Sequence, residues 1–399
     1  MPEEIELPEI EVTPDAGEGT GTGTGTGEGK EGQPNPGQDQ RFPPRRPGSK
    51  EIATLIVRGT EFRNWTSIQV RVARLEAFPT FQFECTEEVP IPATVNGSQF
   101  VPGDVVLALL GGHAIMFGFI TERHVGYDAK NHGVRLIGVG DTADLTNSMV
   151  PLAQLGNHDG KNVQQLARDL SAHLNIMIKT FGAVDPTPFE NIQVLPGETP
   201  MATIERYAKM RNIDIGSLAT GGMLLVGPHS TVATGDLVEG VHILRANCVV
   251  RDQNVFKHII AIGQNFGNDQ HNNDPTTKMT AHLPGSSTRN RHMIVPTDIA
   301  DNLHGVQQRA QMEYDFTEGS LIEAHITVQG WFKDNNRSDD LWRAGEYYMV
   351  HSPSLILNGR KMGCSQCVYE QSNSGGTTTT LTMVKEQQMK GRPTVATRS

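Results

Sequence analysis

The stretch PGDVVLALLGGHAIMFGFITERHVGYDAKNHGVRLIGVG, from Pro102 to Gly140, decides the fold predicted for this chain. It contains three hydrophobic runs, Val105 to Leu110, Ile115 to Ile120 and Val134 to Val139. A Pro-Gly-Asp turn signal precedes the first run, and a pair of glycines ends it. Short aliphatic runs separated by Gly and Pro are typical of β-strands joined by turns. We therefore predict a β-meander here.

The same order of turns and strands returns near the end of the chain. The turn Ala344-Gly345-Glu346 precedes a run from Tyr347 to Val350, and Asn358-Gly359 precedes a second run from Met362 to Glu370. A glycine pair then leads into a third run, Leu381 to Val384. The two copies share almost no identity, but they share the order and spacing of turns and strands. Because the same β-unit occurs twice, we predict that the two copies share one function.

The composition bounds the class of protein. A chain of 399 residues has room for two to four domains, and no apolar run approaches the roughly 20 residues that span a bilayer. The acidic, proline-containing start, MPEEIELPEIEV, is unlike a signal peptide, so we expect no secretion and no membrane insertion. Four scattered cysteines in a chain of this size indicate reduced thiols, as in a bacterial cytoplasm: Cys85, Cys248, Cys364 and Cys367.

The formal net charge of −11 bears on nucleic-acid binding. Tight nonspecific binding depends on Lys and Arg side chains that neutralise phosphates, and the chain has no basic stripe. An acidic chain would instead suit a surface that DNA passes without adhering.

Changes in composition and periodicity divide the chain into six predicted parts. These are a Gly/Thr/Pro-rich arm at 1–48, an all-β domain at 49–149, a small α+β domain at 150–230, a mixed β domain with a long loop and a helix at 231–318, the second β-unit at 319–386, and a polar C-terminal tail at 387–399. The arm cannot bury enough apolar surface to fold alone, so we expect it to be disordered or ordered by a partner. It is either a solubilising tail or, through IELPEIEV, a strand that adds to a neighbour's sheet edge.

Local patterns place the main elements. Apolar residues alternate with polar ones from Ile68 to Val72 and from Ile322 to Val328, which is the period of half-buried strands. Helical spacing follows Asp159-Gly160, and Thr199-Pro200 is typical of an N-cap and first-turn proline. Further strands are expected at 176–181, 213–215, 223–226, 241–250 and 257–263, a loop at 271–275, and a helix from Thr297-Asp298 to about Phe316 with Gly305 as its weak point.

Several residues have side chains that could form a chemical site. Cys364-x-x-Cys367 lacks a second cysteine pair for zinc and lies in a strand pattern, not at a helix N-terminus where a thiolate would be activated, which disfavours a metal or redox role. The fourteen histidines are scattered, although one histidine per subunit could still place a metal on a threefold axis. Trp65, Trp331 and Trp342 are expected to pack in cores or turns. We therefore predict no catalytic, cofactor-binding or metal-binding residue, and no enzyme activity.

The sequence resembles the baseplate hub protein of the contractile-tailed phage Mu, within the late-control-protein-D and VgrG-like family. The resemblance spans residues 52 to 385 and rests on the order of weak motifs. These are Leu55 to Glu87 with Gly59, Phe62 and Trp65-Thr66-Ser67; Gly140-Asp141-Thr142-Ala143-Asp144-Leu145; Val163 to Leu170; Gly330-Trp331; and Leu341-Trp342-Arg343-Ala344-Gly345. Two segments depart from the family: the arm at 1–48, and the region from Asn268 to Arg291, which is longer and richer in His and Asn.

This resemblance implies a mixed α+β, multidomain fold with two related β-barrel-like tube domains, at 49–149 and 319–386, plus smaller α+β domains. It implies a homotrimer whose pseudo-sixfold ring joins a hexameric tail tube to a trimeric central spike in the virion tail baseplate, assembled in the host cytoplasm. Implied partners are the spike, tail tube or tube-initiator proteins, the tape measure protein and baseplate wedge proteins, with DNA passing through the lumen without specific binding. The alternatives are a VgrG-like trunk of a secretion machine, disfavoured because no repetitive β-helix precedes Ser399, and a tail-associated peptidoglycan hydrolase.

Overall fold

The computed structural model describes residues 51–74, 76–85, 100–127, 132–229, 231–264, 278–297, 303–333 and 340–390. All of them belong to one compact unit that starts at Pro47. The arm predicted at 1–48 and the loop predicted at 271–275 lie outside the described residues. Strands predominate over helices in the described residues, so the fold is mixed α+β.

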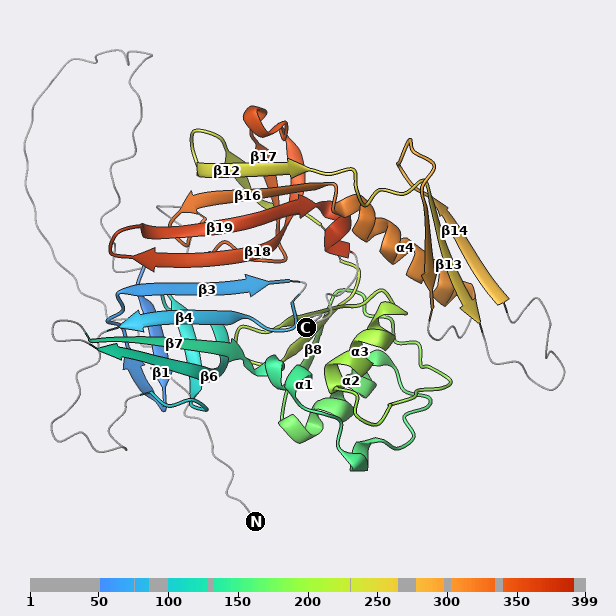
Figure 1. Ribbon diagram of the computed structural model, residues 1–399, viewed down its shortest axis with the longest axis horizontal. Helices are drawn as coiled ribbons and strands as arrows, with labels where there is room; N and C mark the ends of the chain where they lie inside the picture. Colours follow the sequence, from blue (N-terminus) through green and yellow to red (C-terminus); the bar gives the residue numbers. More distant parts are fainter. Residues whose placement is uncertain are drawn as a thin grey trace, which may run out of the picture. The chain divides into compact units, whose positions relative to one another are not determined.

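Thirteen strands form one large sheet (Figure 1). Its main path runs β12-β16-β19-β18-β3-β4-β7-β6-β5-β1-β2, and β11 joins through β17, which pairs with β18. The strands of the first half are β1 (Ala53–Val57), β2 (Thr60–Phe62), β3 (Ser67–Ala73), β4 (Thr80–Cys85), β5 (Val105–Leu110), β6 (His113–Tyr127) and β7 (His132–Gly140). Those of the second half are β11 (Ala233–Val238), β12 (Ile243–Val250), β16 (Ile322–Gln329), β17 (Tyr347–His351), β18 (Arg360–Ser372) and β19 (Gly376–Lys385).

Both predicted meanders are confirmed. Strands β5, β6 and β7 pair antiparallel in sequence order, and so do β17, β18 and β19. The alternating residues of β3, β4 and β16 bury one face, and both halves of the sheet contribute to one hydrophobic core. Within the described residues the sheet ends at β2 and β12, so neither half closes into a barrel by itself. The expected barrel-like domains are therefore two halves of a continuous sheet in one chain.

A smaller α+β layer follows the first half of the sheet. Strands β8 (Ile178–Phe181), β10 (Met223–Val226) and β9 (Asp214–Ser217) form a three-stranded sheet, which shares a second core with helices α1 (Asp144–Asn147), α2 (Val163–Ser171) and α3 (Pro200–Lys209). Thr199 caps α3 as predicted, because its hydroxyl accepts a hydrogen bond from the Ala202 amide at 3.2 Å and proline occupies the first turn. Asn162 and Gln165 form a capping box at α2, which was not predicted from the sequence.

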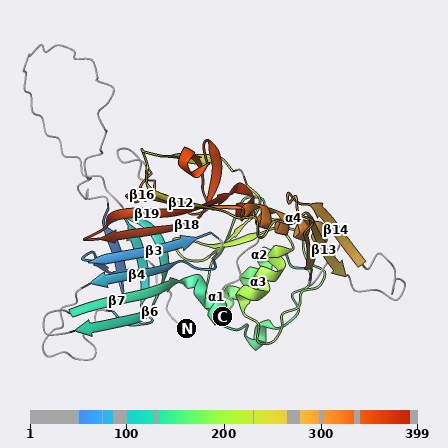
Figure 2. The same ribbon diagram turned by 45° about the horizontal axis from the view of Figure 1, so that its top comes forward.

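A third sheet has the order β14-β13-β15 and consists of β13 (His258–Gln264), β14 (Lys278–Pro284) and β15 (His292–Pro296). Helix α4 (Leu303–Gly319) packs on β13 and β14 and, elsewhere along its length, on the 3-10 helix Glu386–Lys390 (Figure 2). The predicted helix is confirmed from Leu303 onward, and it passes through Gly305, which is buried. Of its predicted start, Thr297 is not helical, and Asp298 lies outside the described residues.

Residues 387–390 do not form the start of a free polar tail. They belong to the 3-10 helix Glu386–Lys390, in which Met389 is fully buried. Met389 packs with Tyr347 and Val384, and a Cβ atom on Gly363 would meet its side chain. One methionine among polar residues is too weak a signal to predict this docking from sequence.

Candidate functional site: the duplicated sheet and its two edges

The two halves of the large sheet have the same strand order. In the first half the order is β3-β4-β7-β6-β5-β1, and in the second it is β12-β16-β19-β18-β17-β11. Each of these six strands therefore has an equivalent at the same place in the order and in the sequence of its half, whereas β2 has none among the described strands. Only the last pair differs, because β1 pairs antiparallel with β5 whereas β11 pairs parallel with β17.

The equivalence extends to single residues. Strand β6 carries a bulge at Thr121 where it pairs with β7, and β18 carries one at Ser365 where it pairs with β19. On either side of these bulges the registers agree, so that Gly118–Tyr127 corresponds to Met362–Gln371. A bulge adds one unpaired residue and bends its strand. The same bend therefore occurs at the same place in both halves.

The two turns before the meanders are also equivalent. The Gly103 amide donates to the Ile120 carbonyl, and the Ile120 amide donates to the Asp104 carbonyl. In the second half Gly345 donates to Cys364, and Cys364 donates to Glu346. Both glycines have left-handed backbone angles, with φ of 96° and 93°, which other residues adopt at a cost.

The two halves join where β18 passes the end of β17. The first part of β18, Arg360–Gly363, pairs with β17, and the last part, Gln366–Ser372, pairs antiparallel with β3. Tyr369 lies opposite Val70, and both are fully buried. On the other face Gln69 donates to the Glu370 carboxylate at 2.9 Å. We call this pairing of β3 with β18 the junction.

The strands equivalent to those of the junction are edges. Strand β12, the equivalent of β3, pairs on one side with β16, and the described residues place no strand on its other side. The last part of β6, Glu122–Tyr127, corresponds to the junction part of β18, and among the described strands only β7 pairs with it. Figure 1 shows β12 and β6 toward opposite ends of the stacked strands. An unpaired strand edge is a template for another strand.

The segment after β7 ties the sheet to the α+β layer. The Thr142 hydroxyl donates to the Ala77 carbonyl at 2.7 Å, and the Asp141 carboxylate accepts from the Gly222 amide at the same distance. Burial raises the pKa of Asp141 even though this hydrogen bond and two further backbone bonds lower it. These contacts give a physical reason for the Gly-Asp-Thr-Ala-Asp-Leu motif from Gly140 to Leu145.

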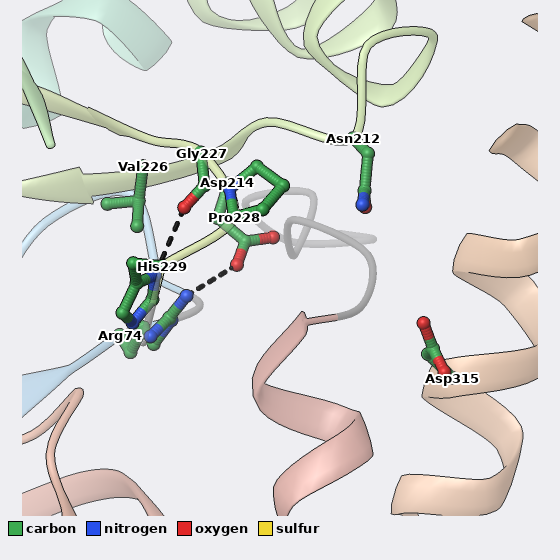
Figure 3. Close-up of a pocket in the computed structure, with 8 residues that line it drawn as sticks. All are labelled: Arg74, Asn212, Asp214, Val226, Gly227, Pro228, His229 and Asp315. Carbon is green, nitrogen blue, oxygen red and sulfur yellow. Dashed lines mark hydrogen bonds and ion pairs between the residues drawn. The ribbon is translucent and has the colours of Figure 1, made fainter. Parts of the chain in front are cut away.

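A cavity of about 160 Å³ lies between the end of β3, the α+β layer and α4. Figure 3 shows Arg74 directed at Asp214 across it, with Nη2 2.8 Å from Oδ2. Both side chains are more than nine-tenths buried, and burial raises the pKa of Asp214 to about 6 against the lowering effect of Arg74. Because the two groups are held to each other, the pair fastens the end of β3 to β9.

Family models match the chain over both parts just described. Residues 52–140 match "Mu phage baseplate assembly protein GpP-like, N-terminal", and residues 142–227 match "Baseplate hub protein gp44-like, second domain". These two matches cover less than half of the chain, and both are to domains of phage baseplate proteins. The boundary between the matched segments falls at Asp141, where the first half of the sheet ends and the α+β layer begins.

Solved structures share the fold. The 43 kDa tail protein of prophage MuSo2 from Shewanella oneidensis has a TM-score of 0.70 at 20% identity, covering 85% of this chain and 99% of that one. A tail protein from Neisseria meningitidis MC58 has a TM-score of 0.71 at 18% identity, with 86% and 98% covered. An E. coli type VI secretion component, described as similar to the phage T4 tail proteins gp27 and gp5, has a TM-score of 0.52 at 11% identity, with 86% and 80% covered. No curated protein is significantly similar in sequence.

The cysteine pair of the second half lies in the core that the two halves of the large sheet share. Cys364 and Cys367 are fully buried in β18, with their sulfur atoms 3.5 Å apart. Burial raises the pKa of the Cys367 thiol well above its usual value, which disfavours the reactive thiolate. Both residues are therefore part of the hydrophobic core.

The predicted scatter of the histidines holds for most of them but not for three. His258, His282 and His292 come together on the β13–β15 sheet, where the His258 and His292 rings stack at 4.5 Å and His258 Nδ1 lies 3.2 Å from His282 Nε2. Desolvation lowers the pKa of His258, and the two neighbouring histidines lower it further. In the part of the chain that the structure describes, no group of three or more His, Cys, Asp or Glu is arranged to hold a metal ion.

The three tryptophans pack as predicted. Trp331 and Trp342 are buried in the main core, and Trp65 packs partly buried against Phe83 and Phe100. None of the helices described is both long and apolar enough to cross a membrane.

Proposed function

We propose that this chain is the structural baseplate hub of a contractile phage tail, located in the virion tail baseplate. Three copies form a pseudo-sixfold ring that joins the hexameric tail tube to the trimeric central spike. The observation that supports this most is the repeated strand order of the large sheet. One chain with two equivalent halves presents two similar units, so a threefold ring of three chains presents six.

The ring resolves a mismatch of symmetry. A hexameric tube contacts six similar sites, and a trimeric spike contacts three. The two halves are equivalent in their strand order, bulge and turn, so three chains can offer six similar sites to the tube. The two halves differ in sequence and in the direction of β1 and β11. The side of the ring that contacts the spike can therefore have threefold symmetry.

The channel of this ring passes DNA without binding it. The sheet surface opposite the core carries charged side chains of both signs, and several of them are paired with each other, such as Arg135 with Glu84 at 2.7 Å. Together with the net charge of −11, this pairing disfavours tight binding to phosphates. The proposal includes no catalytic residue.

Stoichiometry tests the proposal. Light scattering of the full chain, alone and mixed with the trimeric spike of the same tail, measures the mass of the assembly. We expect three chains per ring and three chains per spike trimer. A complex with two or six chains per spike trimer, or a single chain under all conditions with the spike present, would refute the hub.

A VgrG-like trunk of a contractile secretion machine is the second candidate, supported by the fold shared with the type VI secretion component. The two candidates differ in the spike that they seat. Binding to a phage tail spike but not to a secretion-system spike supports the hub, and the opposite result supports the trunk. Zymography on cell wall tests the peptidoglycan hydrolase, since clearing by the purified chain would require a catalytic site.

A further inference from the structure

We infer that the ring closes by pairing β12 of one subunit with the last part of β6, Glu122–Tyr127, of a second copy. This inference rests on the proposed hub and names the surfaces and the register that build it. The template is the junction, where the chain already pairs the equivalent strands, β3 and β18.

The equivalences fix the register. At the junction Cys367 lies opposite Val72, and Tyr369 lies opposite Val70. The bulges at Thr121 and Ser365 make Val125 the equivalent of Tyr369. Strands β7 and β19 are equivalent, and they pair with β4 and β16. When these pairings are followed one strand further, to β3 and β12, Cys248 is the equivalent of Val70. In the ring, therefore, Val125 lies opposite Cys248 of the next subunit.

The same transfer places the neighbouring pairs. Arg123 lies opposite Val250, His124 opposite Val249, Gly126 opposite Asn247 and Tyr127 opposite Ala246. The pairing is antiparallel, like that of the junction. Since side chains alternate between faces, Val125 and Cys248 point to the core side of the sheet, whereas His124 and Val249 point to the other side.

Burial supports this assignment. At the junction Tyr369 and Val70 are fully buried, whereas Val125 is 42% exposed and Cys248 is only partly buried. Other apolar side chains along the two edges are exposed as well: Tyr127 is 83% exposed and Val250 is 68% exposed. Exposed apolar side chains along unpaired strands are typical of an interaction surface.

The two edges differ, so the contact is head-to-tail. Such a contact produces a closed ring when its rotation closes and an open filament otherwise. Each subunit offers one β12 and one β6, and a ring of three contains three such contacts. The junctions and these contacts then alternate six times around the ring.

Disulfide trapping tests the register. Directly opposite residues of an antiparallel pair have Cα atoms about 4.5 or 5.5 Å apart, which a disulfide can bridge. The native Cys248 is one partner, so Val125→Cys supplies the other. The remaining cysteines, Cys85, Cys364 and Cys367, are buried.

The full-length variant is assembled with the spike, its mass is measured, and it is oxidised and separated under denaturing, non-reducing conditions. We expect Val125→Cys to yield covalent dimers and trimers that disappear on reduction and in Val125→Cys/Cys248→Ser. His124→Cys, its neighbour on the other face, should yield none with Cys248, but His124→Cys/Val249→Cys should crosslink.

The outcomes separate the two proposals. A threefold assembly that crosslinks in this pattern supports both. A threefold assembly in which Val125→Cys stays uncrosslinked leaves the hub standing and overturns the edge pairing, as would be the case if the arm at residues 1–48 covered β12. A chain that never assembles with the spike overturns the hub, and the edge pairing with it.

Discussion

Arg74 and Asp214 meet across 140 positions of sequence in a place that solvent hardly reaches. Neither residue stands in a motif, so sequence analysis had no signal for the pair. Asp214 lies at the start of β9, within a strand predicted from its aliphatic neighbours, and Arg74 follows the last residue of β3. A buried charge is tolerated where an opposite charge compensates for lost hydration.

Removal of Arg74 should therefore be costly. Arg74→Met leaves Asp214 without its cation, and we expect the free energy of unfolding at pH 7 to fall by about 3–5 kcal/mol. The matched control is Arg63→Met, which breaks the exposed Arg63–Glu61 pair and should cost less than about 1 kcal/mol. Urea unfolding measures both. Equal losses for the two variants would show that the Arg74–Asp214 pair does not fasten β3 to β9.

Asp214 should also give stability a pH dependence. Because the raised pKa means that the folded state holds this proton more tightly, the stability contributed by Asp214 is greatest below about pH 4 and declines as the pH rises to about 6. Asp214→Asn removes the decline. The free energy of unfolding of Asp214→Asn minus that of the wild type should therefore become more positive from pH 4 to pH 6. A difference that stays constant over this range would contradict the raised pKa.

At the scale of elements, period-two alternation predicted the strands that half-bury one face, such as β3, β4 and β16. It missed β14 and β15, because Lys278–Pro284 and His292–Pro296 lie in a polar, His-rich region. Each of these strands pairs with β13, and α4 packs on β13 and β14. The pairing of β3 with β18 at the junction also could not be predicted from the sequence. Pairing between residues about 300 positions apart has no local signature, although both strands were recognisable.

The equivalent turns allow an element-scale test. Gly103 and Gly345 both have left-handed φ values. An alanine in this backbone conformation is less stable than a glycine by about 1–2 kcal/mol. Neither site is crowded, since a Cβ atom meets nothing within 4 Å at Gly103 and only the far part of Arg74 at 4.0 Å at Gly345. We expect Gly103→Ala and Gly345→Ala to lower the free energy of unfolding by similar amounts. Gly133→Ala, an uncrowded strand position without a left-handed φ, is the control and should change it by clearly less.

At the scale of the whole molecule, the acidic charge predicts behaviour toward DNA. The full chain at physiological salt should leave the mobility of duplex DNA unchanged in a gel-shift assay, because its 45 Asp and Glu outnumber its 34 Lys and Arg and several of the cations are paired with carboxylates. Replacement of Glu84 and Glu122 by lysine adds positive charge to the sheet surface, and retardation should then appear. Retardation of DNA by the unmodified chain would contradict a channel that DNA passes freely.

The recurrence of turns and strands, read from Pro102 to Gly140 and again from Ala344 to Val384, predicted two equivalent units. The structure supports this with matching bulges, hydrogen bonds and strand order. Sequence could not show that the units share one sheet, since that depends on the junction. A reconstruction of the chain assembled with its spike tests the central claim most directly. We predict a threefold ring in which β5–β7 and β17–β19 alternate six times at one radius, with β12 beside β6 of the next subunit. A ring with another number of chains, or one that holds the two meanders at different radii, would contradict it.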